Sequence, residues 1–72
     1  MPETWRKDAM RTVVTGNVVD TCYFPDVGWE TGINDADERG EWEIMERYVD
    51  REAAEKGHKK WCDRCKIMDR VS

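Results

Sequence analysis

The residues best suited to chemistry gather near the C-terminal end of the sequence, in the stretch Gly57–Lys66, which reads GHKKWCDRCK. This stretch holds the only histidine of the chain and two of its three cysteines. His58, Cys62 and Cys65 follow the spacing H-x3-C-x2-C, which places all three side chains on one face if the segment is helical. Imidazole and thiolate groups are the usual ligands of zinc in proteins. The spacing therefore predicts three converging metal ligands.

A structural zinc site needs a fourth ligand, and the one remaining cysteine is Cys22. A Cys3His site formed by Cys22, His58, Cys62 and Cys65 would join the two halves of the chain. Such a link would suit a chain of 72 residues, because small domains often rely on a metal or on disulfides for stability. We therefore expect one zinc ion in a structural role. The alternative is that Cys22 is a small buried side chain and the other thiols are unconnected.

The segment WCDRCK is similar to the thioredoxin active-site motif W-C-x-x-C-K. The resemblance covers four residues: Trp61, Cys62, Cys65 and Lys66. It implies a thiol oxidoreductase that acts through a cysteine of lowered pKa. Asp63-Arg64 replaces the usual Gly-Pro pair, and no strands follow the motif as they do in the thioredoxin fold. Thiol exchange is therefore the second alternative function.

Other catalytic patterns are missing from the sequence. It contains no G-x-S-x-G, no phosphate-binding loop and no H-E-x-x-H. The zinc deaminase pattern is absent too, since Lys59 and Lys60 follow His58. A complete Cys3His set would also leave no open position on the metal for a substrate. We therefore expect a protein that is not an enzyme.

The net charge of −4 is divided unevenly along the chain. Residues 26–55 hold eleven acidic residues against three basic ones, whereas residues 56–72 hold six basic against two acidic. The acidic part should repel nucleic acid and attract a basic partner. Only the basic C-terminal segment has the charge to contact phosphate. Its use as a nucleic-acid-binding zinc module, through Lys59, Lys60, Trp61 and Arg64, is the first alternative function.

The acidic part also carries Trp29 and Trp42, which would serve as anchors in an interface if they are exposed. The residues that we expect to bind a partner are Trp29, Glu30, Asp35, Asp37, Glu38 and Trp42. The sequence thus favours a non-catalytic, zinc-binding interaction module that binds, and in doing so inhibits, a basic or nucleic-acid-binding protein. Inhibitors encoded by phages or mobile elements are one class that would fit. The sequence predicts neither the partner's identity nor the oligomeric state.

We expect a single α+β domain over residues 1–72, with a β-hairpin packed on a C-terminal helix. Residues 10–24 carry two β-branched runs around Gly16-Asn17, a dipeptide that suits a hairpin turn and would place Val13 opposite Asp20. The remaining expected segments are an acidic loop over 25–40, an amphipathic helix over 41–56 and a metal-binding basic segment over 57–70. The hairpin alternation would put two sets of side chains on opposite faces: Met10, Thr12, Val14, Val19, Thr21 and Tyr23 on one, and Arg11, Val13, Thr15, Val18, Asp20, Cys22 and Phe24 on the other.

The sequence shows no export signal and no membrane span. The first ten residues, MPETWRKDAM, have no apolar run behind their charges. No segment approaches the roughly 20 apolar residues that cross a bilayer. We therefore expect a cytoplasmic protein that does not enter membranes, which agrees with thiols that are not engaged in disulfides.

Overall fold

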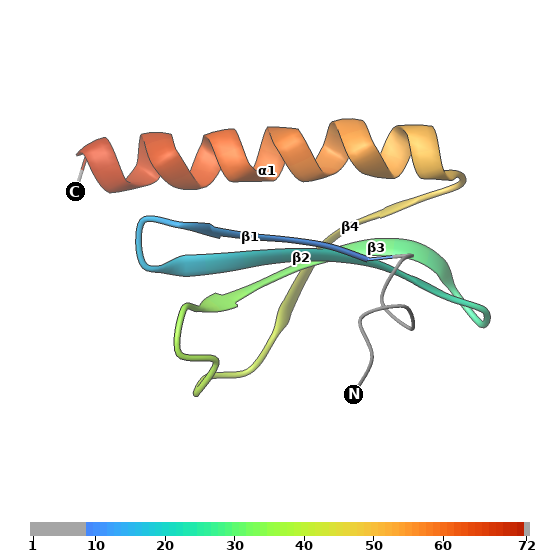
Figure 1. Cartoon of the computed structure of the whole chain (residues 1–72), viewed down its shortest axis with the longest axis horizontal. Helices are drawn as coiled ribbons and strands as arrows, with labels where there is room; N and C mark the ends of the chain where they lie inside the picture. Colours follow the sequence, from blue (N-terminus) through green and yellow to red (C-terminus); the bar gives the residue numbers. More distant parts are fainter. Residues whose placement is uncertain (1–8, 72) are drawn as a thin grey trace.

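The computed structural model describes residues 9–71, with side chains described as far as Ile67. The described residues form a four-stranded antiparallel sheet, in the order β1-β2-β3-β4, followed by one helix. The elements are β1 (Ala9–Val14), β2 (Asn17–Phe24), β3 (Gly28–Asp35), β4 (Glu43–Tyr48) and α1 (Arg51–Val71). Figure 1 shows α1 running along one side of the sheet, so the molecule has two layers. The α+β class and the N-terminal hairpin are confirmed.

The hairpin of β1 and β2 turns at Thr15 and Gly16, one residue earlier than predicted. Both turn residues have positive φ, 45° and 86°, as a two-residue turn of the primed type requires. Val13 therefore pairs with Val18, two residues away from its predicted partner. Because side chains alternate with a period of two, an offset of two residues leaves every side chain on its predicted face. The predicted pairs are wrong, but the predicted faces are right.

The acidic loop predicted over residues 25–40 is wrong across Gly28–Asp35, which forms β3, one of the two inner strands of the sheet. Two glycines and three acidic or amide side chains lower the intrinsic β propensity of this segment. The strand forms because β2 pairs with one of its edges and β4 with the other, so tertiary pairing outweighs local preference. Only the short turn at 25–27 and the connection at 36–42 remain irregular.

The helix predicted over residues 41–56 is wrong in its first half, because Glu43–Tyr48 forms β4 at the edge of the sheet. Thr31 of β3 pairs with Glu46, whereas its neighbour Gly32 pairs with Ile44. Met45 is therefore an extra residue, a β-bulge that breaks the two-residue alternation of the strand. The broken alternation imitates helical spacing, which is why the sequence pattern favours a helix here.

The bulge also turns the strand over. We call the side of the sheet that α1 covers the helix side, and the opposite side the open side. Ile44, before the bulge, lies on the open side beside Gly32. Glu46 and Tyr48, after it, lie on the helix side, where Glu46 accepts a hydrogen bond from Trp61 of α1. One short strand thus supplies side chains to both faces.

Helix α1 begins after Asp50, whose side-chain Oδ1 accepts a hydrogen bond from the backbone N–H of Ala53 at 2.8 Å. This is an N-terminal cap, and Glu52 in the first turn adds favourable charge at the positive end of the helix dipole. The helix then continues through Gly57 to Val71. It therefore includes the whole segment 57–70 that the sequence analysis assigned to metal binding.

The hydrophobic core is small and lies between α1 and the helix side of the sheet. Val14 and Val19 from the hairpin pack against Cys62 and Cys65 from the helix. Ile33 and Trp61 are partly buried around this cluster. Both cysteines of the C-x2-C pair thus belong to the core.

Candidate interaction site

The structure does not bring the four predicted zinc ligands together. His58 contacts Thr21 of β2, so Thr21 points to the helix side. The next residue, Cys22, points to the open side and lines a surface hollow there. The sheet therefore separates Cys22 from His58, Cys62 and Cys65. Among residues 9–67, the structure places no group of three or more histidine, cysteine or acidic side chains where it could hold a metal ion.

Both ring nitrogens of His58 already have hydrogen-bond partners. Nδ1 lies 2.7 Å from the Thr21 hydroxyl, and Nε2 lies 2.9 Å from the Thr12 hydroxyl. The side chain is 8% exposed, and burial lowers the pKa of His58, with Asp20 opposing this shift. The neutral imidazole therefore joins α1 to β1 and β2 across the interface.

Three further side chains, those of Thr31, Tyr48 and Glu46, extend the contact between His58 and Thr21 into a polar seam beneath the helix. Thr21 Oγ1 lies 2.6 Å from Thr31 Oγ1, which lies 3.0 Å from the Tyr48 hydroxyl. Tyr48 donates to Glu46 at 3.1 Å. Since the carboxylate can only accept and each hydroxyl has one proton, Thr31 donates to Tyr48, Thr21 to Thr31, and Nδ1–H of His58 to Thr21. The polar seam is thus a continuous donor-to-acceptor chain that ends on Glu46.

The C-x2-C pair has the opposite properties to a reactive dithiol. Cys62 and Cys65 are 8% and 5% exposed, and burial raises the pKa of both thiols. A nucleophilic cysteine needs accessibility and a lowered pKa. The pair also lies within α1, past its first three turns, and not at the helix N-terminus where thioredoxins carry it. The similarity to the thioredoxin motif therefore does not extend to the environment of the thiols.

The basic residues of α1 are largely engaged within the chain. Lys59 pairs with Asp63 at 2.9 Å, and Lys60 pairs with Glu46 at 2.6 Å. Trp61 is partly buried, and both Lys60 and Arg64 lie over its ring, at 5.4 and 5.0 Å from the centroid. Stacking of a nucleobase on Trp61 would have to displace these contacts. The geometry gives the nucleic-acid alternative no direct support.

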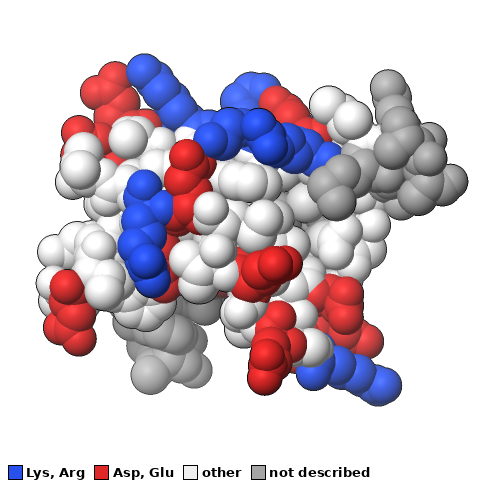
Figure 2. Space-filling view, turned by 180° about the vertical axis from the view of Figure 1, so that it is seen from behind, with Lys and Arg blue, Asp and Glu red and all other residues white. Residues whose placement is uncertain are grey.

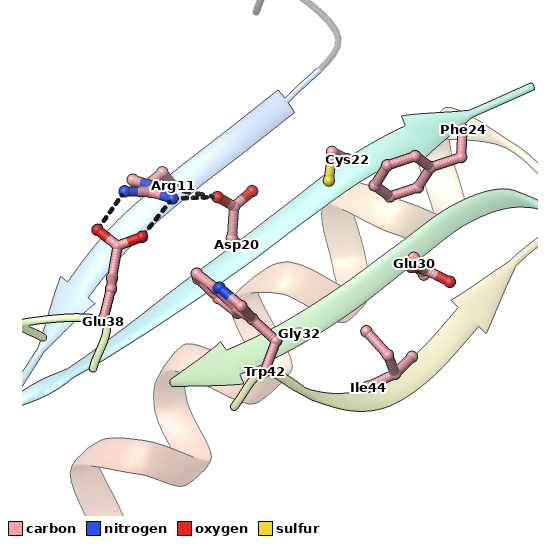
Figure 3. A pocket seen from close by; sticks show the side chains of 9 residues that line it. All are labelled: Arg11, Asp20, Cys22, Phe24, Glu30, Gly32, Glu38, Trp42 and Ile44. Carbon is pink, nitrogen blue, oxygen red and sulfur yellow. Dashed lines mark hydrogen bonds and ion pairs between the residues drawn. The ribbon is translucent and has the colours of Figure 1, made fainter. Parts of the chain in front are cut away.

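A hollow of about 300 Å³ lies on the open side of the sheet. Figure 3 shows its side chains standing on the four strands and on the connection between β3 and β4, with α1 behind the sheet. Its lining consists of Arg11, Asp20, Cys22, Phe24, Glu30, Gly32, Glu38, Trp42 and Ile44. Phe24, Trp42 and Ile44 are 44%, 39% and 45% exposed, which is high for large apolar side chains. The hollow is therefore an apolar surface open to solvent.

Gly32 sets the depth of the hollow between two of these apolar side chains. A Cβ atom at this position would lie 3.3 Å from the Trp42 ring and 3.4 Å from the Ile44 side chain. Glycine thus lets both side chains settle onto the strand. Since Ile44 reaches this side only because of the bulge at Met45, the bulge and the glycine together shape the hollow.

One end of the hollow holds a cluster of charges around Arg11. Its guanidinium lies 2.8 Å from Asp20 and 2.9 Å from Glu38, and 5.8 Å from the centroid of the Trp42 ring. These contacts raise the pKa of Arg11, with the Asp20 hydrogen bond as the largest cause. We call Asp20, Glu38 and Trp42 the acid–aromatic clamp. Figure 3 shows Arg11 between its two carboxylates.

The other end of the hollow holds Glu30, which pairs with Arg47 of β4 at 3.0 Å. Cys22 and Phe24 stand beside it on the neighbouring strand. Across the whole lining there are three carboxylates and a single guanidinium. The connection at 36–42, which forms one wall, is acidic as well. The potential in the hollow therefore favours a cation.

The residues predicted to bind a partner divide into three groups. Glu30, Glu38 and Trp42 line the hollow. Asp35 and Asp37 are exposed nearby, at the end of β3 and in the connection after it. Trp29 is different, because it is only 8% exposed and packs on the helix side, where Arg51 of α1 lies over its ring. Trp29 is therefore not available as a surface anchor.

The sequence analysis did not predict that the β1–β2 hairpin supplies side chains to the hollow. Arg11, Asp20 and Phe24 come from β1 and β2, and Gly32 and Ile44 from segments predicted as loop and helix. A usable signal was present, since the hairpin alternation already grouped Arg11, Asp20 and Phe24 on one face. Knowing which face α1 covers would have identified this set as the open one.

Basic and acidic side chains are distributed unevenly over the surface. Figure 2 shows basic side chains along the edge that α1 occupies, with acidic ones among them, and a further group of acidic side chains below, around the connection between β3 and β4. No helix in the described part of the chain is both long and apolar enough to cross a bilayer.

No protein family, curated protein or solved structure matches this chain. Its function must therefore be argued from the site itself.

Proposed function

We propose that the protein is a non-catalytic interaction module that binds a basic segment of a partner protein in the hollow on the open side of the sheet. The observation that carries this proposal is the combination of exposed Phe24, Trp42 and Ile44 with an excess of carboxylates around them. Apolar anchors surrounded by charge are the usual composition of a protein-binding surface.

The chemistry of the lining narrows the class of partner. Phosphate groups would meet Asp20, Glu30 and Glu38 at close range, which disfavours nucleic acid in the hollow. A volume of about 300 Å³ is at the lower end of ligand pockets and accommodates one or two large side chains. In a peptide that alternates cationic and apolar residues, the apolar side chains would contact the apolar lining and the cationic ones would pair with the carboxylates. A partner whose basic surface is covered in this way would lose that surface for binding nucleic acid, which is a route to inhibition.

The test uses a peptide probe, an acetylated hexapeptide that alternates arginine and phenylalanine. We expect it to bind with micromolar to millimolar affinity, to weaken as salt is added, and to shift amide NMR signals of β2, β3 and β4. Trp42→Ala should reduce the affinity about tenfold, since anchor side chains carry most of the energy of such contacts. Val49→Ser is the matched control, because Val49 is 94% exposed and lies outside the hollow.

Two comparison peptides separate the contribution of charge to the affinity from the contribution of apolar contact. Glutamate in place of arginine should abolish binding, and serine in place of phenylalanine should weaken it strongly. No binding of the arginine–phenylalanine peptide, or signal shifts confined to α1, would refute the proposal.

A further inference from the structure

The resting occupant of the acid–aromatic clamp is a side chain of the protein itself. Arg11 donates to Glu38 through both terminal nitrogens, at 2.9 and 3.2 Å. Its Nε donates to Asp20 at 3.0 Å, and its guanidinium faces the Trp42 ring. Three neighbouring groups thus contact one guanidinium at once, in the manner of a ligand site.

This arrangement distinguishes a guanidinium from an ammonium group. The two parallel donors to Glu38 match the planar fork of arginine, and Nε reaches a second carboxylate. A flat guanidinium also stacks on an indole ring more readily than a compact ammonium does. A lysine in the same place could supply the charge but not the paired geometry.

We propose that the acid–aromatic clamp is an arginine-recognition site, and that an arginine of the partner takes the place of Arg11 in it. The inference rests on the proposed function, since it names the side chain by which a basic segment is recognised. Arg11 then competes with the partner's arginine for the clamp, and so lowers the affinity of the unbound protein for cations.

The clamp is held in place by contacts that do not involve Arg11. Asn34 Nδ2 donates to the carbonyl oxygen of Gly40 at 2.9 Å, which fixes the connection at 36–42 to the sheet. The backbone N–H of Glu38 donates to the carbonyl of Asp35 at 2.8 Å. Trp42 packs on Gly32. Departure of the Arg11 side chain therefore leaves the backbone at Glu38 and the ring of Trp42 with the contacts that hold them.

Exchange of one arginine for another is sterically open. Arg11 belongs to the edge strand β1, and its side chain is 37% exposed. Its terminal nitrogens contact Glu38, whose side chain is 40% exposed, so an incoming arginine can approach the clamp from solvent. The exchange leaves the charge of the clamp unchanged and requires no movement of the sheet.

The experiment removes the internal occupant and supplies a small replacement. Arg11→Ala is titrated with N-acetyl-arginine amide and with N-acetyl-lysine amide, and binding is followed by amide NMR shifts and by the thermal unfolding midpoint. We expect the variant to bind the arginine probe at least tenfold more tightly than the wild type does, and more tightly than it binds the lysine probe. The arginine probe should also raise its unfolding midpoint.

Arg47→Ala is the matched control, because Arg47 also pairs with a carboxylate of the hollow but no aromatic ring is found over it among the described residues. It should show no gain for either probe. Arg11→Lys provides a second test if Arg11→Ala does not fold, since lysine keeps the charge but cannot fill the fork. It too should bind the arginine probe more tightly than the wild type.

Equal binding of the two probes by these Arg11 variants, or no gain over the wild type, would overturn the inference. That result differs from failure of the proposed function. If the arginine–phenylalanine peptide binds the wild type and depends on Trp42, but Arg11→Ala changes nothing, the interaction module stands and the clamp is not its arginine site.

Discussion

Gly57 of α1 lies directly against the ring of Tyr48 of β4, so that a Cβ atom at this position would overlap the ring. Glycine in the middle of a helix costs about 1 kcal/mol relative to alanine, yet the helix runs through it. The close approach of the helix to Tyr48 explains why glycine stands at this position. Contact at this point is what brings His58, one residue later, into the polar seam.

Gly57→Ala should therefore destabilise the protein although alanine favours a helix. Overlap with the ring should cost about 2–3 kcal/mol, which is more than the propensity gain of about 1 kcal/mol, so we expect a net loss of about 1–2 kcal/mol in the free energy of unfolding. Urea denaturation followed by tryptophan fluorescence measures it. Glu55→Ala, on the exposed face of the same helix, should be nearly neutral, and a stabilised Gly57→Ala variant would contradict the packing.

The stability should fall as the pH is lowered through the range in which His58 titrates. Burial lowers the pKa of His58 in the folded state, so the unfolded chain binds a proton more readily. The stability that depends on neutral His58 is therefore fully present above the pKa of histidine in the unfolded chain, about 6.5. It is lost as the pH falls through the lower pKa of His58 in the folded state. Each unit of depression corresponds to about 1.4 kcal/mol. Urea denaturation at pH 7.5 and pH 5.5 should show the loss.

His58→Gln is the control for this pH dependence. Glutamine can still bond to a threonine hydroxyl but does not titrate. The variant should be less stable than the wild type at pH 7.5 and should lose less stability on acidification. A variant with the same pH dependence as the wild type would place the titrating group elsewhere.

One thiol should react in the folded protein and three in the unfolded protein. Cys22 lines the open hollow, whereas Cys62 and Cys65 are buried and burial raises the pKa of both. Titration with a chromogenic disulfide reagent, with and without denaturant, counts them. The arginine–phenylalanine peptide should slow the reaction of Cys22, and fast reaction of all three thiols in the folded protein would contradict the helix packing.

Thr21→Val should cost about 1–3 kcal/mol, because it keeps the shape of the side chain but breaks the polar seam between His58 and Thr31. Tyr48→Phe should break the same chain farther along. If the seam acts as one network, the double variant should lose less stability than the sum of the two single losses. Strict additivity in urea denaturation would mean that the hydrogen bonds act independently.

The sidedness of the hairpin could be predicted from sequence, whereas its turn could not. Alternation in residues 10–24 depends only on the period of a strand, so it survives an error in the turn. Both Thr15-Gly16 and Gly16-Asn17 can form a tight turn around the shared glycine, and in the structure Asn17 already pairs with Val14 and Asp35 as part of β2. The order of β-branched residues does not contain that information.

The structure keeps Cys22 apart from the other three predicted zinc ligands, and the sequence could not show this because it does not tell which face of the sheet α1 covers. The spacing of His58, Cys62 and Cys65 correctly put them on one face of a helix. A Cys3His site also required that face to meet Cys22, and the helix instead meets Thr12 and Thr21. Apolar content could not decide this, because the interface is partly polar and the open side carries large apolar side chains.

One extra residue, Met45 in the bulge, determines which side of the sheet the side chains of β4 face. Without it, Ile44, Glu46 and Tyr48 would all point the same way, so either the hollow would lose its aliphatic wall or the helix would lose its polar contacts. Deletion of one residue here would thus move the side chains of half of β4 between the helix side and the open side. Binding surface and core are tied to the same point of the backbone, and a change in length at that point cannot alter one while sparing the other.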